Sequence, residues 1–279
     1  MKNSKIIIAG VVLMTMIGMT PLLAQNEIKE QLTVPLTDPA KAGTLKVGII
    51  NGSIRVTGYA GKEVVIDAQT ENGNNKKNEN KTDELATGMK RISTRGGIEI
   101  TAEEKNNVIN LNANTMKQPV NLSIKVPQNF SLKVSTINNG DIIIDNVNGE
   151  FEVTNVNGDI ALNGISGSAV ANTVNGTMKV SFKSVKADSP MAFTTLNGNV
   201  DVTFPATAKF NVKLKSDRGE IYSDYDMDVD KTQPKGVRSA QGGMYKVSVE
   251  DWIQGKVNGG GSEIMMKNMH GNIYIRKAK

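Results

Sequence analysis

Apolar and polar residues repeat with a short, fixed period in the centre of the chain. Residues 139–183 divide into five nine-residue phrases, NGDIIIDNV, NGEFEVTNV, NGDIALNGI, SGSAVANTV and NGTMKVSFK. Most phrases open on Asn-Gly, continue with two apolar positions separated by one polar residue, and end on an aliphatic residue. A repeat at a fixed short interval indicates a repeat architecture.

Two folds could use this pattern. Asn-Gly between alternating apolar residues is a strong hairpin signal, so a meander of hairpins is one of them. However, Ile142 and Ile144 share one face of a strand, whereas Val147 is out of step with both. A straight strand cannot place all three on one face, but a chain that turns a corner at Asp145-Asn146 can. The pattern therefore favours an all-β fold, a right-handed parallel β-helix or β-solenoid with Asn-Gly coils of about 18–22 residues.

Two phrases make one coil of 18 residues, so equivalent residues of successive coils should stack. Phe151 should lie over Ala169, and Val153 over Ala171, each a large residue over a small one. Two interior rows are predicted, Ile142, Ile160, Met178, Val200 and Ile221, and Ile144, Leu162, Val180 and Val202.

The flanking sequence follows the same pattern less strictly. Residues 51–67 resemble an N-terminal coil, and residues 258–277 read as a last pair of strands that closes the stack. The stretch at about 70–88 has few apolar residues and is predicted to be a polar surface loop. A second excursion is predicted at about 224–243.

The first 24 residues are typical of a signal peptide, with Lys2 and Lys5, an apolar run, and Ala24 at the cleavage site. An uncleaved membrane anchor is the alternative, but the uninterrupted apolar run is shorter than the roughly 20 residues that span a bilayer. We expect a single β-solenoid domain at 25–279, with no stable transmembrane anchor after cleavage. Because the chain has no cysteine, disulfides cannot stabilise the fold and a lipid-modified cysteine cannot anchor the protein to a membrane.

Composition argues against several classes of function. The formal net charge is +5, aromatic residues make up 4%, and the densest lysines lie in the Asn-rich loop. Proteins that bind nucleic acid usually combine a basic stripe with stacking aromatics, so no nucleic-acid partner is expected. No phosphate loop, zinc motif or dinucleotide fingerprint is present, and no cofactor is expected.

Acidic and amide side chains recur at equivalent coil positions. Asp141 and Asp159 should stand about 5 Å apart on adjacent coils, where they could bind a cation or act as paired acids on a polysaccharide. The next coils carry Thr177 and Asn199, so this row does not continue. A row of amides, Asn139, Asn157, Asn175 and Asn197, is expected to be structural, with recognition of sugar hydroxyls as the alternative.

Only a few other residues are candidates for chemistry. His270 is the single histidine and precedes Gly271 where other phrases carry asparagine, so we interpret it as a turn residue. Trp252 lies in an aromatic-rich C-terminal region with Tyr222, Tyr225 and Tyr245. These aromatics are expected to cap the open end of the solenoid; a glycan-stacking platform is the alternative.

The chained NGDI turns, the KVP…F.LKV strand and the closing NGGG…HGNIYI resemble the DUF4097 family of adhesin-like domains over roughly residues 44–277. The resemblance implies an exported or envelope-associated, single-stranded right-handed β-helix and no catalytic residue. We predict a non-enzymatic, exported protein that acts as an adhesin-like binding or scaffold module. Its expected partner is a glycan or a protein of the cell envelope. Its expected location is the periplasm or the cell surface. The alternative is a polysaccharide lyase or hydrolase on the same scaffold.

Overall fold

The computed structural model describes residues 29–70, 98–114, 119–138, 140–230, 237–241, 244–248 and 251–279. These residues form strands and turns and none lies in a helix, which confirms the all-β prediction. No helix among them is therefore long and apolar enough to cross a bilayer. The predicted leader and nearly all of the polar loop predicted at about 70–88 lie outside the described residues and stay predictions.

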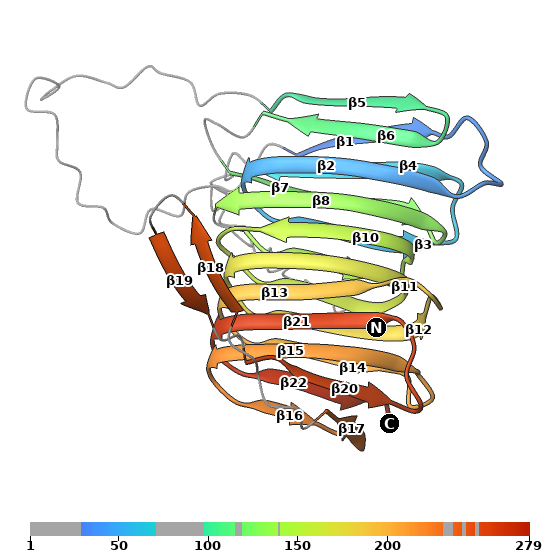
Figure 1. Ribbon diagram of the computed structural model, residues 1–279. Coiled ribbons are helices and arrows are strands. Elements are labelled where there is room, and N and C mark those ends of the chain that lie inside the picture. The colour runs from blue at the N-terminus through green and yellow to red at the C-terminus, as the bar shows by residue number, and fades with distance from the viewer. Residues whose placement is uncertain are drawn as a thin grey trace, which may run out of the picture.

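Most strands belong to two stacks, and the strands within each stack run parallel to one another (Figure 1). The first stack contains, in spatial order, β6 (Val108–Ala113), β2 (Gly43–Asn51), β8 (Phe130–Asn138), β10 (Asn148–Asn155), the second half of β11 (Ile160–Asn175), β13 (Met191–Asn197), β21 (Glu263–His270) and β15 (Phe210–Arg218). The second stack contains β7 (Val120–Pro127), β3 (Ile54–Tyr59), β9 (Ile142–Asp145), the first half of β11, β12 (Met178–Val185), β14 (Val200–Phe204), β22 (Ile273–Lys277) and β16 (Ile221–Ser223).

The central strands stack in the predicted register. Ile160 lies opposite both Ile142 and Met178, and Leu162 lies opposite both Ile144 and Val180. All of these side chains are fully buried. Phe151 also lies opposite Ala169, and Val153 opposite Ala171. The parallel, solenoid-like stacking of the Asn-Gly coils is therefore confirmed, and an antiparallel meander is excluded for these strands.

The corner predicted at Asp145-Asn146 is also present. β9 ends at Asp145, Asn146 has a φ of 57°, and Val147 is fully buried. Asparagine tolerates this left-handed conformation better than most residues. It turns the chain so that Val147 faces the core, and Gly164, whose φ is also 57°, makes the same turn in the next coil.

The two terminal segments are inserted into the stacks and do not extend them. Val200 lies opposite Ile273, and Ile273 lies opposite Ile221. The prediction that Ile221 stacks directly on Val200 is therefore wrong, and residues 258–277 do not close the stack. In the same way β21 separates β13 from β15, and at the other end β2 and β3 separate β6 and β7 from β8 and β9.

Because a strand is inserted between two others, the chain segment that joins the neighbouring coils must pass the inserted strand to reach the next coil. The connection 205–209, from β14 to β15, must pass the position that β21 occupies. Asn197-Gly198 and Arg218-Gly219 are 21 residues apart and look like one coil in the sequence. In space the pair His270-Gly271 lies between them, because Asn197 and Arg218 are both in register with His270.

Antiparallel strands cover both stacks at one end and the first stack at the other end. At one end β5 (Ile100–Lys105) pairs with β6, β4 (Glu63–Thr70) with β7, and β1 (Lys29–Pro35) with β4. At the other end β20 (Ile253–Val257) pairs with β15, and β17 (Met227–Val229) with β20. Within the segment predicted as an excursion, β18 (Val237–Gln241) also forms a separate hairpin with β19 (Met244–Ser248). Covered ends hide backbone groups that would otherwise pair with other chains.

An aromatic row fills the core at the C-terminal end. The ring centroids of Phe182 and Phe204 are 5.3 Å apart, those of Phe204 and Phe210 4.7 Å, and those of Phe210 and Tyr225 5.7 Å. The Tyr225 hydroxyl lies 2.8 Å from the carbonyl oxygen of Pro205, to which it donates. Burial, aided by the charge of Asp224, raises the pKa of Tyr225 to about 12. Tyr225 is therefore part of the core at this end, and the capping of the strand edges by the C-terminal aromatics stays a prediction.

Candidate binding surface

A row of side-chain amides, here called the amide row, runs along the corner formed by the Asn-Gly pairs. Asn157 Nδ2 donates to Asn138 Oδ1 at 3.2 Å, Asn175 Nδ2 to Asn157 Oδ1 at 2.8 Å, and Asn197 Nδ2 to Asn175 Oδ1 at 2.7 Å. Asn138 thus occupies the place in the row that was predicted for Asn139, which lies outside the described residues. An amide has two N–H groups and two oxygen lone pairs, so Asn175 uses only half of its hydrogen-bonding capacity in the row.

A second polar row lies inside the same corner, two residues before each turn. Its side chains donate to the carbonyl oxygen of a turn glycine on a neighbouring coil, which satisfies a backbone acceptor at the edge of the core. The pairs are Thr136 with Gly52 (3.0 Å), Asn155 with Gly140 (2.9 Å), Thr173 with Gly158 (3.1 Å), Thr195 with Gly176 (3.0 Å), Asn268 with Gly198 (3.2 Å) and Ser216 with Gly271 (3.1 Å).

The glycines of this corner allow the coils to approach closely. A Cβ atom added to Gly176 would lie 2.1 Å from the carbonyl oxygen of Gly158. The same approach recurs one strand further on, where a Cβ on Gly198 would lie 2.0 Å from the carbonyl oxygen of Gly176. Side chains at these positions would force neighbouring coils apart.

Asp141 and Asp159 take part in backbone hydrogen bonding between coils. Asp141 Oδ1 accepts the Asp159 N–H at 2.8 Å, and Asp159 Oδ1 accepts the Thr177 N–H at 2.7 Å. Asn199 accepts the Asn272 N–H in the same way at 2.8 Å. Because an amide oxygen replaces the carboxylate at an equivalent position, the feature these residues share is a hydrogen-bond acceptor. The described residues contain no group of three or more acidic or histidine side chains that could hold a metal ion.

Beside the amide row runs an apolar column that faces solvent. It consists of the residues that precede each turn, Ile50, Ile137, Val156, Val174, Leu196 and Met269. Five of the six side chains are 38–44% exposed, and Val156 is half-buried. The strand registers place these residues on consecutive strands, so the column extends about 24 Å at the usual strand spacing. Contiguous exposed apolar residues of this kind mark interaction sites.

His270 occupies the turn position that the sequence predicts for it. It lies in register with Asn197 on one side and Arg218 on the other. Arg218 Nη1 is 3.1 Å from His270 Nε2, and because arginine only donates, Nε2 must be the acceptor. The other ring nitrogen, Nδ1, is buried without a hydrogen-bond partner among the described residues.

Trp252 lies among three lysines from two neighbouring strands. Lys213 Nζ is 4.8 Å from the centroid of the indole ring, Lys215 Nζ 5.8 Å and Lys267 Nζ 5.9 Å. Lys213 and Lys215 belong to β15 and Lys267 belongs to β21. Ammonium groups at these distances are attracted to the electron-rich face of the indole. We call these four residues the Trp252 cluster.

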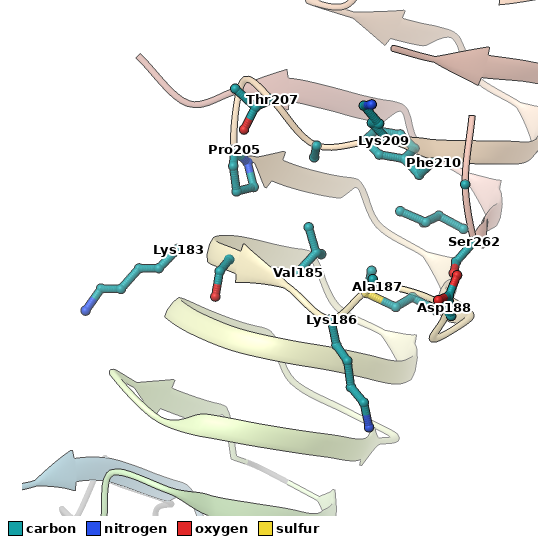
Figure 2. Close-up of a pocket in the computed structure, with 15 residues that line it drawn as sticks. Lys183, Val185, Lys186, Ala187, Asp188, Pro205, Thr207, Lys209, Phe210 and Ser262 are labelled. Carbon is teal, nitrogen blue, oxygen red and sulfur yellow. The ribbon is translucent and has the colours of Figure 1, made fainter. Parts of the chain in front are cut away.

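A half-open cleft of about 490 Å³ lies where connection 205–209 passes the inserted strand β21 (Figure 2). Val185 and Phe210 form apolar walls of the cleft. Figure 2 shows that the side chains of Lys183 and Lys186 point away from the space between these two walls. Lys186 Nζ instead pairs with Glu150 Oε1 at 2.8 Å, which lowers the pKa of Glu150 below its usual value. The cleft therefore follows from the topology, and neither Lys183 nor Lys186 faces its interior.

Sequence reasoning did not predict the apolar column or the lysines of the Trp252 cluster. The aliphatic residue that ends a phrase faces the core at Val147 but is exposed at Val174. The difference lies in the preceding residues: a left-handed Asn146 turns Val147 inward, whereas the inward-facing Thr173 leaves Val174 outside. Lys267 is 52 residues from Lys215 in the sequence, and only the insertion of β21 brings them together.

The solved structures that are similar to this chain include two bacterial proteins. A candidate cell adhesion protein from Clostridium sporogenes is 12% identical, with 90% of this chain and 100% of that chain covered and a TM-score of 0.46. A candidate adhesin from Bacteroides fragilis is 11% identical, with 91% of this chain and 98% of that chain covered and a TM-score of 0.28. No protein of curated function matches. Residues 131–251 match the family model described as Toastrack DUF4097, which confirms the resemblance over that segment.

Proposed function

We propose that this protein is a non-enzymatic, adhesin-like binding or scaffold module of the cell envelope. It is exported by the leader at 1–24, folds as a single domain, and acts in the periplasm or at the cell surface. Its coils wind in the right-handed sense, as parallel β-strand crossovers almost always do. A link to envelope stress, which the resemblance to DUF4097 implies, is part of the proposal.

The apolar column is the observation that carries this proposal. Five of its six side chains stay exposed, although the interior of the same coils is fully buried. The amide row beside it adds donors and acceptors at the same repeat distance. An envelope glycan or protein that lies along this corner would contact C–H groups on the column and hydrogen-bond to the amides. Repetition over several strands converts weak contacts into useful affinity.

A matched pair of double variants tests this function. Val174→Ser with Leu196→Ser removes the centre of the column, whereas Val229→Ser with Leu32→Ser makes the same chemical change at similarly exposed positions on the end-covering strands. Purified mature protein is sedimented with an envelope fraction from the cells that produce it, and the retained amount is measured. We expect about tenfold less retention for the column variant and unchanged retention for the control. Equal retention of both variants, or no retention of the unmodified protein, would refute the proposal.

A further inference from the structure

The Trp252 cluster collects positive charge on the outward side of β15 and β21. The three Nζ atoms all lie within 6 Å of one ring centroid, so they are no more than about 12 Å apart. Asp217 Oδ1, 3.5 Å from Lys215 Nζ, provides one opposing charge. Neither Lys213 nor Lys267 forms an ion pair with another residue that the structure describes. Three like charges held this close favour the binding of an anion between them.

We propose that the Trp252 cluster is a binding site for an anionic polysaccharide, which it recognises through a carboxylate or phosphate group and through the face of a sugar ring. This inference rests on the proposed function, because it names the class of envelope ligand. It concerns a different surface from the amide corner, so the protein would have two contact regions.

The combination of groups favours a charged sugar over other anions. The ammonium groups bind the anionic substituent. Trp252 is only partly buried, so the part of its indole that the lysines do not cover offers an apolar surface for the C–H face of a pyranose ring. Gln254 lies opposite Lys213 in the pairing of β20 with β15, so its exposed amide points to the same side and can bind hydroxyl groups. An acidic peptide has no ring for the indole, and single-stranded nucleic acid is usually held by several stacking aromatics.

The site can be tested with a defined probe. Binding of the mature protein to polygalacturonate oligomers is measured by calorimetry and compared with binding to the carboxyl-reduced, neutral form of the same oligomers. Lys213→Gln with Lys267→Gln is the site variant. Lys46→Gln with Lys179→Gln is the matched control, because it removes the same charge from exposed positions on β2 and β12.

We expect the site variant to weaken binding of the acidic oligomer about tenfold, with less than a twofold change for the control. Trp252→Ala should also weaken it, and the neutral oligomer should bind far less tightly than the acidic one. Equal losses in the two double variants, or equal binding of the neutral oligomer, would overturn the proposal. So would equally tight, lysine-dependent binding of poly-L-glutamate, which would identify an acidic-protein site, or no binding of the acidic oligomer at all.

The same assay separates this inference from the proposed function. The column variant Val174→Ser with Leu196→Ser should bind the acidic oligomer normally, because it leaves the Trp252 cluster intact. If the protein is retained by the envelope fraction but does not bind the acidic oligomer, only the proposed anion site is refuted. If it binds the oligomer but is not retained, the proposed function is refuted.

Discussion

The stacked interior makes a quantitative prediction for Ile160→Ala. Ile160 is fully buried between Ile142 and Met178, which lie directly opposite it on the two neighbouring strands. The substitution removes the equivalent of three buried methylene groups, worth about 2.4 kcal/mol at about 0.8 kcal/mol each. Backbone hydrogen bonds hold the neighbouring strands in place, so the cavity closes only in part, which raises the expected loss to about 3–4 kcal/mol.

Ile137→Ala is the matched control, because it makes the same chemical change at a side chain that is 44% exposed. We expect it to lower the free energy of unfolding by less than about 1 kcal/mol. The measurement is equilibrium unfolding in urea, followed by the circular dichroism of the strands, with the m-value compared among the three proteins. If the two variants differ by less than about 1 kcal/mol at equal m-values, the stacked register is incorrect.

Two further predictions test the inner polar row and the buried tyrosine. Thr195→Val deletes the hydroxyl that donates to the carbonyl oxygen of Gly176 and should lower the free energy of unfolding by about 1–3 kcal/mol. Thr154→Val, at an exposed position, is the control and should change the free energy of unfolding little. Equal urea midpoints for the two variants would contradict the role of the Thr195 hydroxyl. Tyr225 has a pKa of about 12 in the folded state against 10.0 for the free side chain, so the unfolded chain loses this proton first as the pH rises. Its contribution to stability, about 3 kcal/mol for a shift of about two pKa units, should be present below pH 10 and lost between pH 10 and about pH 12. Tyr225→Phe should flatten that part of a stability–pH curve, and an unchanged curve would show that another group causes the loss.

The sequence by itself determined the central coils of this protein. An eighteen-residue interval with fixed apolar positions, such as Ile142, Ile160 and Met178, can bury all of them only if the strands stack in parallel register. The corner at Asn146 was predictable for a similar reason, because the shift of apolar parity at Val147 requires a turn. Local pattern and global fold demand the same arrangement here.

Only the tertiary structure decided the order of the strands at both ends. A strand edge offers the same backbone donors and acceptors to any partner, so the sequence of β22 fits beside β14 as well as the sequence of β16 does. The site residues divide in the same way. The amides of Asn157, Asn175 and Asn197 are neighbours because they belong to successive turns. The insertion of the distant strand β21 brings Lys267 beside Lys215 and Trp252. A periodic pattern of residues carries no information about contacts between segments so far apart in the chain.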